Sequence, residues 1–312
     1  MISCTDFIPA YNEMFKYIHD RDGYAGVQTL WNYWFKPSEK GHPLLNYVKK
    51  DGLKGAWDYW TIISKEEACE ATRMINLKQG WSSSTMHHCP SKGRLLQMQE
   101  ELGVEPYKHY CDHCNYYRAM LMEAGLVWVR DHRNVDKASC SSIIYDPKVF
   151  NGMMNFDEDT VVAEYHAGEL EYYHPSFHYS LNRAAEYLAT NYGESAVTEW
   201  LTQYTKAVYW KLIEDIKAKG FSVLRDMIQD SYDKEHASDA VEFQLEDSKL
   251  SVTVHWCPAV KYLKETNRVI SKWYPCTTSV VMGVIAESCG LDFQMGEYDE
   301  ETGKTAYVFS VK

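Results

Sequence analysis

The stretch AVEFQLEDSKLSVTVHWCPAVKYL, residues 240–263, decides the fold class. Apolar and polar residues alternate over 241–246, as in a strand with one buried face. After a turn at 247–248 the same alternation resumes in a second strand. Cys257-Pro258 then ends that strand and begins a helix, because proline favours the first helical position. The stretch therefore predicts a β-hairpin followed directly by a helix.

Helices precede this hairpin, and a second hairpin follows it. Apolar residues at helical spacing cover 195–219, and Gly193 and Gly220 bracket them as stop signals. Another helix is expected after Cys276, and a last strand pair over 291–311. The predicted order is helices followed by β-β-α-α-β-β.

An earlier stretch, ATRMINLKQGWSSSTMHHCPSKGRLL at residues 71–96, repeats this pattern. The matches at a constant offset of 168 are Ile75/Phe243, Leu77/Leu245, Thr85/Thr253, His87/His255, Cys89/Cys257 and Pro90/Pro258. At an offset of 165 they are Cys111/Cys276, Gly125/Gly290 and Leu126/Leu291, and near the end Lys137 is set against Lys304. Because these matches are collinear and fall on apolar, Gly, Pro and Cys positions, they favour an internal duplication.

The expected fold is therefore α+β, an internal duplication of a helical lead-in plus a β-β-α-α-β-β unit with antiparallel sheets. The first repeat, with an N-terminal helical extension, covers 1–150, and the second covers 176–312. Between them, 151–175 contains six acidic residues and no Lys or Arg, which is typical of a solvated connector. Its histidines leave a metal-binding or substrate lid as the alternative.

Composition limits the classes of partner. The chain has 312 residues, 45% hydrophobic and 24% charged, as in a soluble globular protein of two domains. A net charge of -12 argues against nucleic acid and anionic membranes, and no signal peptide or membrane span is expected. Nine cysteines, an odd number, favour reduced thiols in the cytoplasm. We expect a small organic substrate as partner, and leave a homodimer open as an alternative.

Each copy carries a His-x-Cys sequence at the end of its second predicted strand. His87 and Cys89 are expected on one strand face, and His255 and Cys257 on the matching face. A thiol just before a helix N-terminus is favoured as thiolate, and an imidazole nearby can take its proton. These four residues are the candidate catalytic groups. The alternative is that both cysteines are small buried hydrophobes that end a strand.

The first copy adds a Cys-x-x-Cys motif with an internal histidine at 111–114. Together with Cys89 upstream, this motif has the ligand types of a tetrahedral zinc site. The second copy has Thr278 and Ser279 in place of the motif's last two residues, so only the first copy would bind the metal. The candidate zinc ligands are Cys89, Cys111, His113 and Cys114.

Four features of the second copy together resemble a known protein family. They are Tyr192-Gly193-Glu194 in the lead-in, Cys257-Pro258 after the hairpin, Cys276 before the next helix, and a terminal strand pair. In these features the chain resembles the L-2-amino-thiazoline-4-carboxylate hydrolase-like family, most clearly over 185–312 and more faintly over 66–146. The resemblance implies hydrolytic opening of a small cyclic compound with a C=N bond. It also implies a cysteine in the last strand, which Cys140 supplies in the first copy, whereas the second copy has Tyr307.

The expected function is thus a hydrolase that opens a C–N bond in a ring or amidine-like small molecule. A Cys/His pair or a metal-activated water would attack the substrate, and zinc is the one cofactor expected. The alternative is a non-catalytic sensor module that binds a small molecule or zinc.

Overall fold

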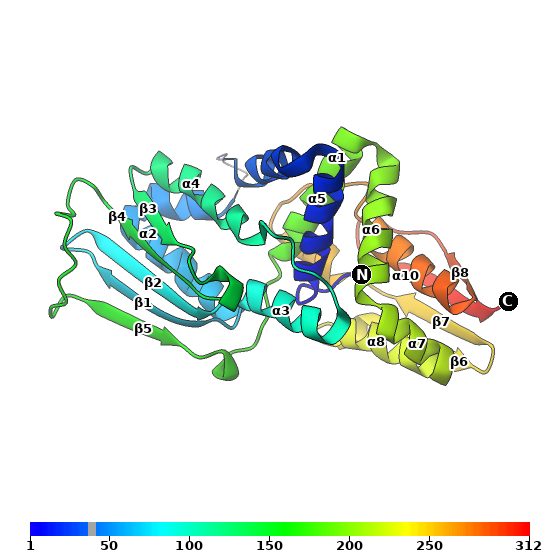
Figure 1. Ribbon diagram of the computed structural model, residues 1–312. Coiled ribbons are helices and arrows are strands. Elements are labelled where there is room, and N and C mark those ends of the chain that lie inside the picture. Colours follow the sequence, from blue (N-terminus) through cyan, green and yellow to red (C-terminus); the bar gives the residue numbers. More distant parts are fainter. Residues whose placement is uncertain (37–41) are drawn as a thin grey trace. The chain divides into compact units, whose positions relative to one another are not determined.

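The computed structural model describes residues 1–36 and 42–312 (Figure 1). The chain folds into two compact units, and each has an antiparallel sheet with helices, which confirms the α+β class. The first unit comprises Ile18–Glu100 and Glu105–Tyr173, and the second comprises Met1–Tyr17, Glu101–Val104 and His174–Lys312. These boundaries differ from the expected 1–150, 151–175 and 176–312. The N-terminal segment belongs to the second unit, and the expected connector lies almost entirely in the first.

The sheet of the first unit has five strands in the order β3-β4-β2-β1-β5. The strands are β1 (Glu70–Asn76), β2 (Trp81–His88), β3 (Val127–Asp131), β4 (Cys140–Tyr145) and β5 (Val161–Tyr165). The helices are α1 (Phe7–Phe35), which begins in the second unit, α2 (Leu44–Glu66), α3 (Pro90–Leu102) and α4 (Arg118–Glu123), with 3-10 helices η1 (Tyr110–Tyr117), η2 (Val135–Lys137) and η3 (Ala167–Glu169). Helices α2 and α4 pack on each other and contact the sheet through β2 and β3, respectively.

The sheet of the second unit has four strands in the order β6-β7-β9-β8. The strands are β6 (Val241–Glu246), β7 (Lys249–Val254), β8 (Leu291–Met295) and β9 (Thr305–Val311). The helices are α5 (Phe177–Tyr192), α6 (Glu194–Val208), α7 (Trp210–Lys219), α8 (Phe221–Asp233), α9 (Pro258–Glu265) and α10 (Cys276–Cys289), with the 3-10 helix η4 (Ser238–Ala240). Across the described residues, no helix has both the length and the apolar character that a bilayer span requires.

The segment expected to be a solvated connector contributes a strand to the first sheet. Strand β5 pairs antiparallel with β1, with Tyr165 opposite Ala71. Tyr165 is buried against Ala71 and Cys69 at this sheet edge. Further upstream, Asn76 donates a hydrogen bond of 2.7 Å to the carboxylate of Asp157. Residues 161–165 of the expected connector are therefore an edge strand of the first sheet, whereas residues 151–158 are exposed, as expected of a solvated segment.

The two units have the same strand order, since β1-β2-β4-β3 in one corresponds to β6-β7-β9-β8 in the other. Their helices also break at corresponding glycines. Gly52 interrupts α2 with a φ of 54°, and Gly220 separates α7 from α8 with a φ of 79°. Both glycines have the positive φ that side chains disfavour, and they are separated by the same offset of 168. A duplication predicts this agreement, and the duplication itself stays a prediction.

The strand registers correct one detail of the sequence comparison, which set Cys140 against Tyr307. Ser84 pairs with Ser142, whereas Val252, its counterpart at the offset of 168, pairs with Tyr307. The counterpart of Tyr307 is therefore Ser142. The turn between the last two strands has the same length in both units, so the offset of 165 holds through the final strand.

Candidate functional site

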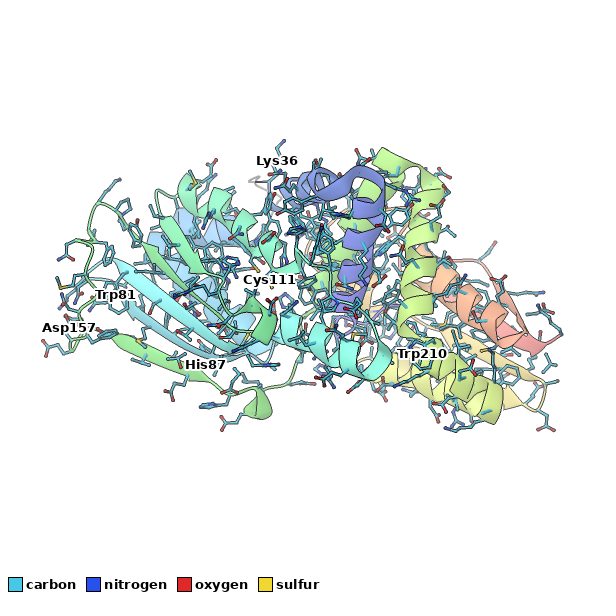
Figure 2. All side chains as sticks on the ribbon, in the orientation of Figure 1. Lys36, Trp81, His87, Cys111, Asp157 and Trp210 are labelled. Atoms are coloured by element: carbon cyan, nitrogen blue, oxygen red, sulfur yellow. The ribbon has the colours of Figure 1, made fainter. Side chains whose placement is uncertain are left out.

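The first unit contains a cavity of about 170 Å³ between its sheet and the helices beside it. Helix α2 contributes Trp60 to the wall, and α3 contributes Lys92. The 3-10 helix η1 contributes Cys111, which is labelled in Figure 2. A cavity of this kind, with an aromatic wall and several polar groups, has the character of a small-molecule site.

The floor of the cavity is made by strands β2, β3 and β4. Because side chains alternate along a strand, Ser82 and Ser84 of β2 face the cavity, together with Ser142 of β4. Arg130 of β3 lies opposite Ser142 in the sheet and also faces inward. These floor positions are therefore polar, with small hydroxyl groups beside the Arg130 cation, and Arg73 of β1 lines the cavity as another cation.

His113 and Cys114, which are adjacent in η1, form the chemically most distinctive pair of the cavity. The His113 Nδ1–H donates a hydrogen bond to the backbone carbonyl of Tyr110. This bond leaves Nε2 turned toward the Cys114 Sγ, 3.5 Å away. A thiol, a base and a third group that orients the base are the parts of an activated nucleophile. The Tyr110 carbonyl supplies the third part and fixes the tautomer.

Charge around Cys114 favours its thiolate. Burial alone would raise the pKa of this thiol, but the neighbouring charges of His113 and Arg130 outweigh burial and lower the pKa to about 6. For His113, burial opposes the charged ring, and the adjacent Cys114 thiolate still raises the pKa of the imidazole. The two shifts agree in direction, and both favour a thiolate–imidazolium pair near neutral pH.

Arg130 lines the cavity and carries one donor without a partner among the described residues. Its Nη2 lies 3.6 Å from the Cys140 Sγ, within hydrogen-bonding reach of that sulfur. Its Nη1 is buried and has no hydrogen-bond partner within residues 1–36 and 42–312. A buried guanidinium donor without a partner is costly, and a planar anion such as a carboxylate satisfies it. An unpaired guanidinium donor on a lining residue therefore favours an anionic group on a ligand.

The predicted pair of His87 and Cys89 is not brought together in the cavity. Cys89 lines it, and its Sγ accepts a hydrogen bond of 3.5 Å from the backbone N–H of Lys92 in the first turn of α3, as the motif suggested. Burial nevertheless raises the pKa of Cys89. His87, which is labelled in Figure 2, is exposed and lies outside the lining. Its Nε2 lies 2.8 Å from the hydroxyl of Thr72. Alternation puts His87 on the other sheet face, and the strand ends before Cys89.

In the second unit His255 and Cys257 also diverge. His255 is exposed and forms an ion pair of 3.2 Å with Glu242. Cys257 is buried, and with Val254 it lines a cavity of only about 10 Å³. Strand β7 ends at Val254, so the expected alternation does not extend to Cys257. The expectation that His255 and Cys257 share one face is therefore wrong, and burial raises the pKa of the Cys257 thiol.

The four candidate zinc ligands Cys89, Cys111, His113 and Cys114 all line the first unit's cavity. In the described part of the chain, however, only one group of three or more Cys, His, Asp or Glu residues has all its ligand atoms within 4.8 Å of one another. That group is Cys4, His178 and Glu235 in the second unit. Zinc in the first unit's cavity stays a prediction, and it would require the four side chains to move closer together.

The sequence predicts His113 and Cys114 as metal ligands, and their relation as base and nucleophile becomes visible only in the structure. The same holds for Arg130, whose place beside Cys114 depends on a sheet register that the local sequence does not reveal. One sequence pattern does indicate that Arg130 faces inward. In Trp128-x-Arg130, strand alternation places the cation on the same face as a buried tryptophan.

Comparison with known proteins does not assign the chain to a family. No protein-family model, no curated protein and no solved structure matches the chain. Any function assigned to the cavity therefore rests on its own residues.

Proposed function

We propose that the first unit's cavity is the active site of a hydrolase that cleaves a C–N bond in a small ring or amidine-like molecule. The observation that carries the proposal is the pairing of the Cys114 Sγ with the His113 Nε2 at 3.5 Å inside the cavity. Cys114 is the nucleophile in this scheme, and His113 is its acid–base partner.

The reaction can be written with the groups at hand. The Cys114 thiolate adds to the electrophilic carbon of the substrate, and the π electrons of its double bond move onto the attached heteroatom. Collapse of the adduct breaks the C–N bond, and the His113 imidazolium gives its Nε2 proton to the departing nitrogen. Water then attacks the carbon held by sulfur while His113 takes a proton from it. Breakage of the C–S bond restores the thiolate–imidazolium pair.

Arg130 supports a substrate that carries a carboxylate. Its buried Nη1, which has no partner among the described residues, would donate a hydrogen bond to one carboxylate oxygen at the cavity floor. The hydroxyls of Ser84 and Ser142 lie on the same floor and add donors for the same group. We therefore expect anionic substrates to be bound better than neutral analogues.

A panel of small cyclic imines and amidines, each with and without a carboxylate, tests this proposal. Mass spectrometry detects addition of water to each compound in the presence of the full-length chain. The proposal predicts turnover of carboxylate-bearing members that is lost in Cys114→Ser and retained in the control Cys276→Ser. Turnover that survives Cys114→Ser, or no turnover of any member, would contradict it.

A second candidate, a zinc-binding sensor module, is favoured by one observation. Cys89, Cys111, Cys114 and Cys140 all line the same cavity, and clustered thiols suit zinc. Metal analysis of the purified chain separates the two functions. Zinc that is lost in Cys111→Ser, together with no turnover of any compound, would favour the sensor.

A further inference from the structure

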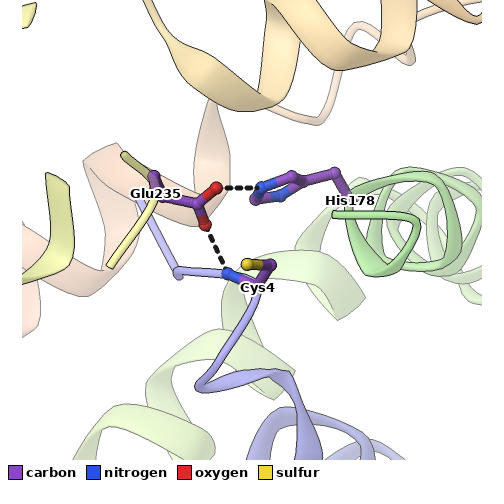
Figure 3. A group of neighbouring side chains, drawn as sticks. All are labelled: Cys4, His178 and Glu235. Atoms are coloured by element: carbon purple, nitrogen blue, oxygen red, sulfur yellow. Dashed lines mark hydrogen bonds and ion pairs between the residues drawn. The ribbon is translucent and has the colours of Figure 1, made fainter. Parts of the chain in front are cut away.

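Three ligand-type side chains meet inside the second unit, outside the proposed active site (Figure 3). Cys4 belongs to the N-terminal segment, His178 to the first turn of α5, and Glu235 to the turn that follows α8. Their exposed fractions are 0%, 0% and 3%. Residues from three distant parts of the sequence therefore converge at one buried point.

The spacing and the chemistry of these atoms suit zinc. One thiol, one imidazole and one carboxylate oxygen lie within 4.8 Å of one another. Zinc binds these ligands at about 2.0–2.3 Å, so tetrahedral ligands lie roughly 3–4 Å apart. Magnesium and calcium prefer oxygen ligands alone, so a mixed S, N and O set selects a transition metal.

Hydrogen bonds already join the three residues and fix the side chains of His178 and Glu235. The His178 Nε2 lies 3.0 Å from one carboxylate oxygen of Glu235, and the other oxygen accepts the backbone N–H of Cys4. On the far side of the ring, the His178 Nδ1 lies 3.0 Å from the hydroxyl of Tyr274. A second partner of this kind fixes the ring of a metal-binding histidine and directs its other nitrogen to the ion.

Burial of the Glu235 carboxylate is a thermodynamic reason to expect a bound cation at this point. A carboxylate removed from water is costly unless it is paired or coordinates a metal. The Glu235 side chain is only 1% exposed, and its carboxylate lies 3.0 Å from the His178 Nε2. A divalent cation at this point would compensate the charge permanently.

We infer that the second unit binds one zinc ion through Cys4, His178 and Glu235, with water as the fourth ligand. The ion would fasten the N-terminal segment to α5 and to the end of α8. This role is structural and independent of the hydrolase proposed for the first unit.

The test uses the full-length chain, stripped of metal by a chelator and then titrated with Zn²⁺ or Co²⁺ alone. We expect one tightly bound metal per chain that depends on Cys4, a higher thermal midpoint with Zn²⁺, and a thiolate-to-metal absorption band with Co²⁺. Cys4→Ser should abolish the Co²⁺ band and weaken Zn²⁺ binding by on the order of 100-fold or more, since even the partners of ligands contribute about 10–100-fold.

Matched controls locate the site. Cys257→Ser alters another buried thiol of the same unit, and Cys114→Ser alters the first unit's cavity; both should keep the Cys4-dependent site. If Cys4→Ser does not fold, Tyr274→Phe replaces it, because this variant only removes the hydroxyl beside His178 and should weaken Zn²⁺ binding by about 10-fold or more. The inference is overturned if no metal binds, or if the variants of Cys4 and Tyr274 bind Zn²⁺ as the unaltered chain does.

Discussion

At corresponding positions of the two sheets, the first unit has Ser84, Ser142 and Arg130 where the second has Val252, Tyr307 and Met295. The strand order is the same in both units. The cavities at corresponding places beside the two sheets differ, at about 170 Å³ in the first unit and about 10 Å³ beside Val254 and Cys257 in the second. Small hydroxyls and a cation leave space and polarity above one sheet, whereas aromatic and aliphatic side chains fill the same place above the other.

The difference between the two cavities indicates that the second unit is built as a packed core and the first as a site for chemistry. In the second unit Tyr307 and Phe309 are buried, with exposed fractions of 2% and 0%, and Cys257 is a buried thiol with a raised pKa. In the first unit the cavity retains a thiol–imidazole pair and an unused guanidinium donor among the described residues. One backbone arrangement can therefore serve as a packed core or as a reactive site, according to a few inward positions.

The largest effect is expected from Cys114→Ser, which replaces the reactive thiolate by a hydroxyl that His113 cannot ionise. Turnover of any substrate found in the panel should fall by on the order of 10³ or more, as for other nucleophile replacements. Steady-state kinetics measures it. Cys276→Ser, at the position that corresponds to Cys111, is the control and should stay within about twofold of the unaltered chain.

The next effect concerns stability. Phe309→Ala should lower the free energy of unfolding by about 3–5 kcal/mol, because it opens a cavity in a fully packed core. Its counterpart Ile144→Ala should cost about 2 kcal/mol, since Ile144 already lines an open cavity. Urea denaturation measures both values. Equal losses would mean that the two units are packed alike, which would contradict the contrast between a packed second unit and an open cavity in the first.

A smaller effect is expected from Arg130→Met, which gives the first unit the residue found in the second. Loss of a charge-assisted hydrogen bond of about 1.5–3 kcal/mol should raise KM for carboxylate substrates roughly 10–150-fold. KM for neutral analogues should change much less, although kcat should fall for both types because Arg130 also lowers the pKa of Cys114. The KM values of the two substrate types are the measurement. An equal rise of KM for both substrate types would contradict a role of Arg130 in binding an anion.

Local patterns in the sequence were sufficient for much of the fold. Alternation over 241–246 predicted β6, and proline at position 258 predicted the start of α9, because both signals act within a few residues. Strand β5 could not be predicted in this way, since its pairing with β1 joins segments about 90 residues apart. The acidic residues around it concealed an ordered edge strand.

The site was predicted in part. A helix N-terminus beside Cys89 was correctly expected, but burial has a larger effect on that thiol than the helix N–H group does. Cys114 differs because His113 and Arg130 contribute charge at close range, and only the fold brings Arg130 there. Which cysteine is activated therefore depends on the balance of burial and charge, which spacing alone does not reveal.

The most direct test of the central claim is the pH dependence of alkylation at Cys114. Because its pKa is lowered to about 6, the thiolate is lost as pH falls through about 6 and is almost fully formed above about 7. Iodoacetamide labelling followed by peptide mass spectrometry gives the rate for each cysteine. We predict a midpoint near pH 6 for Cys114, which moves upward in His113→Asn. A midpoint near that of an ordinary thiol, about 8.5, would contradict the account.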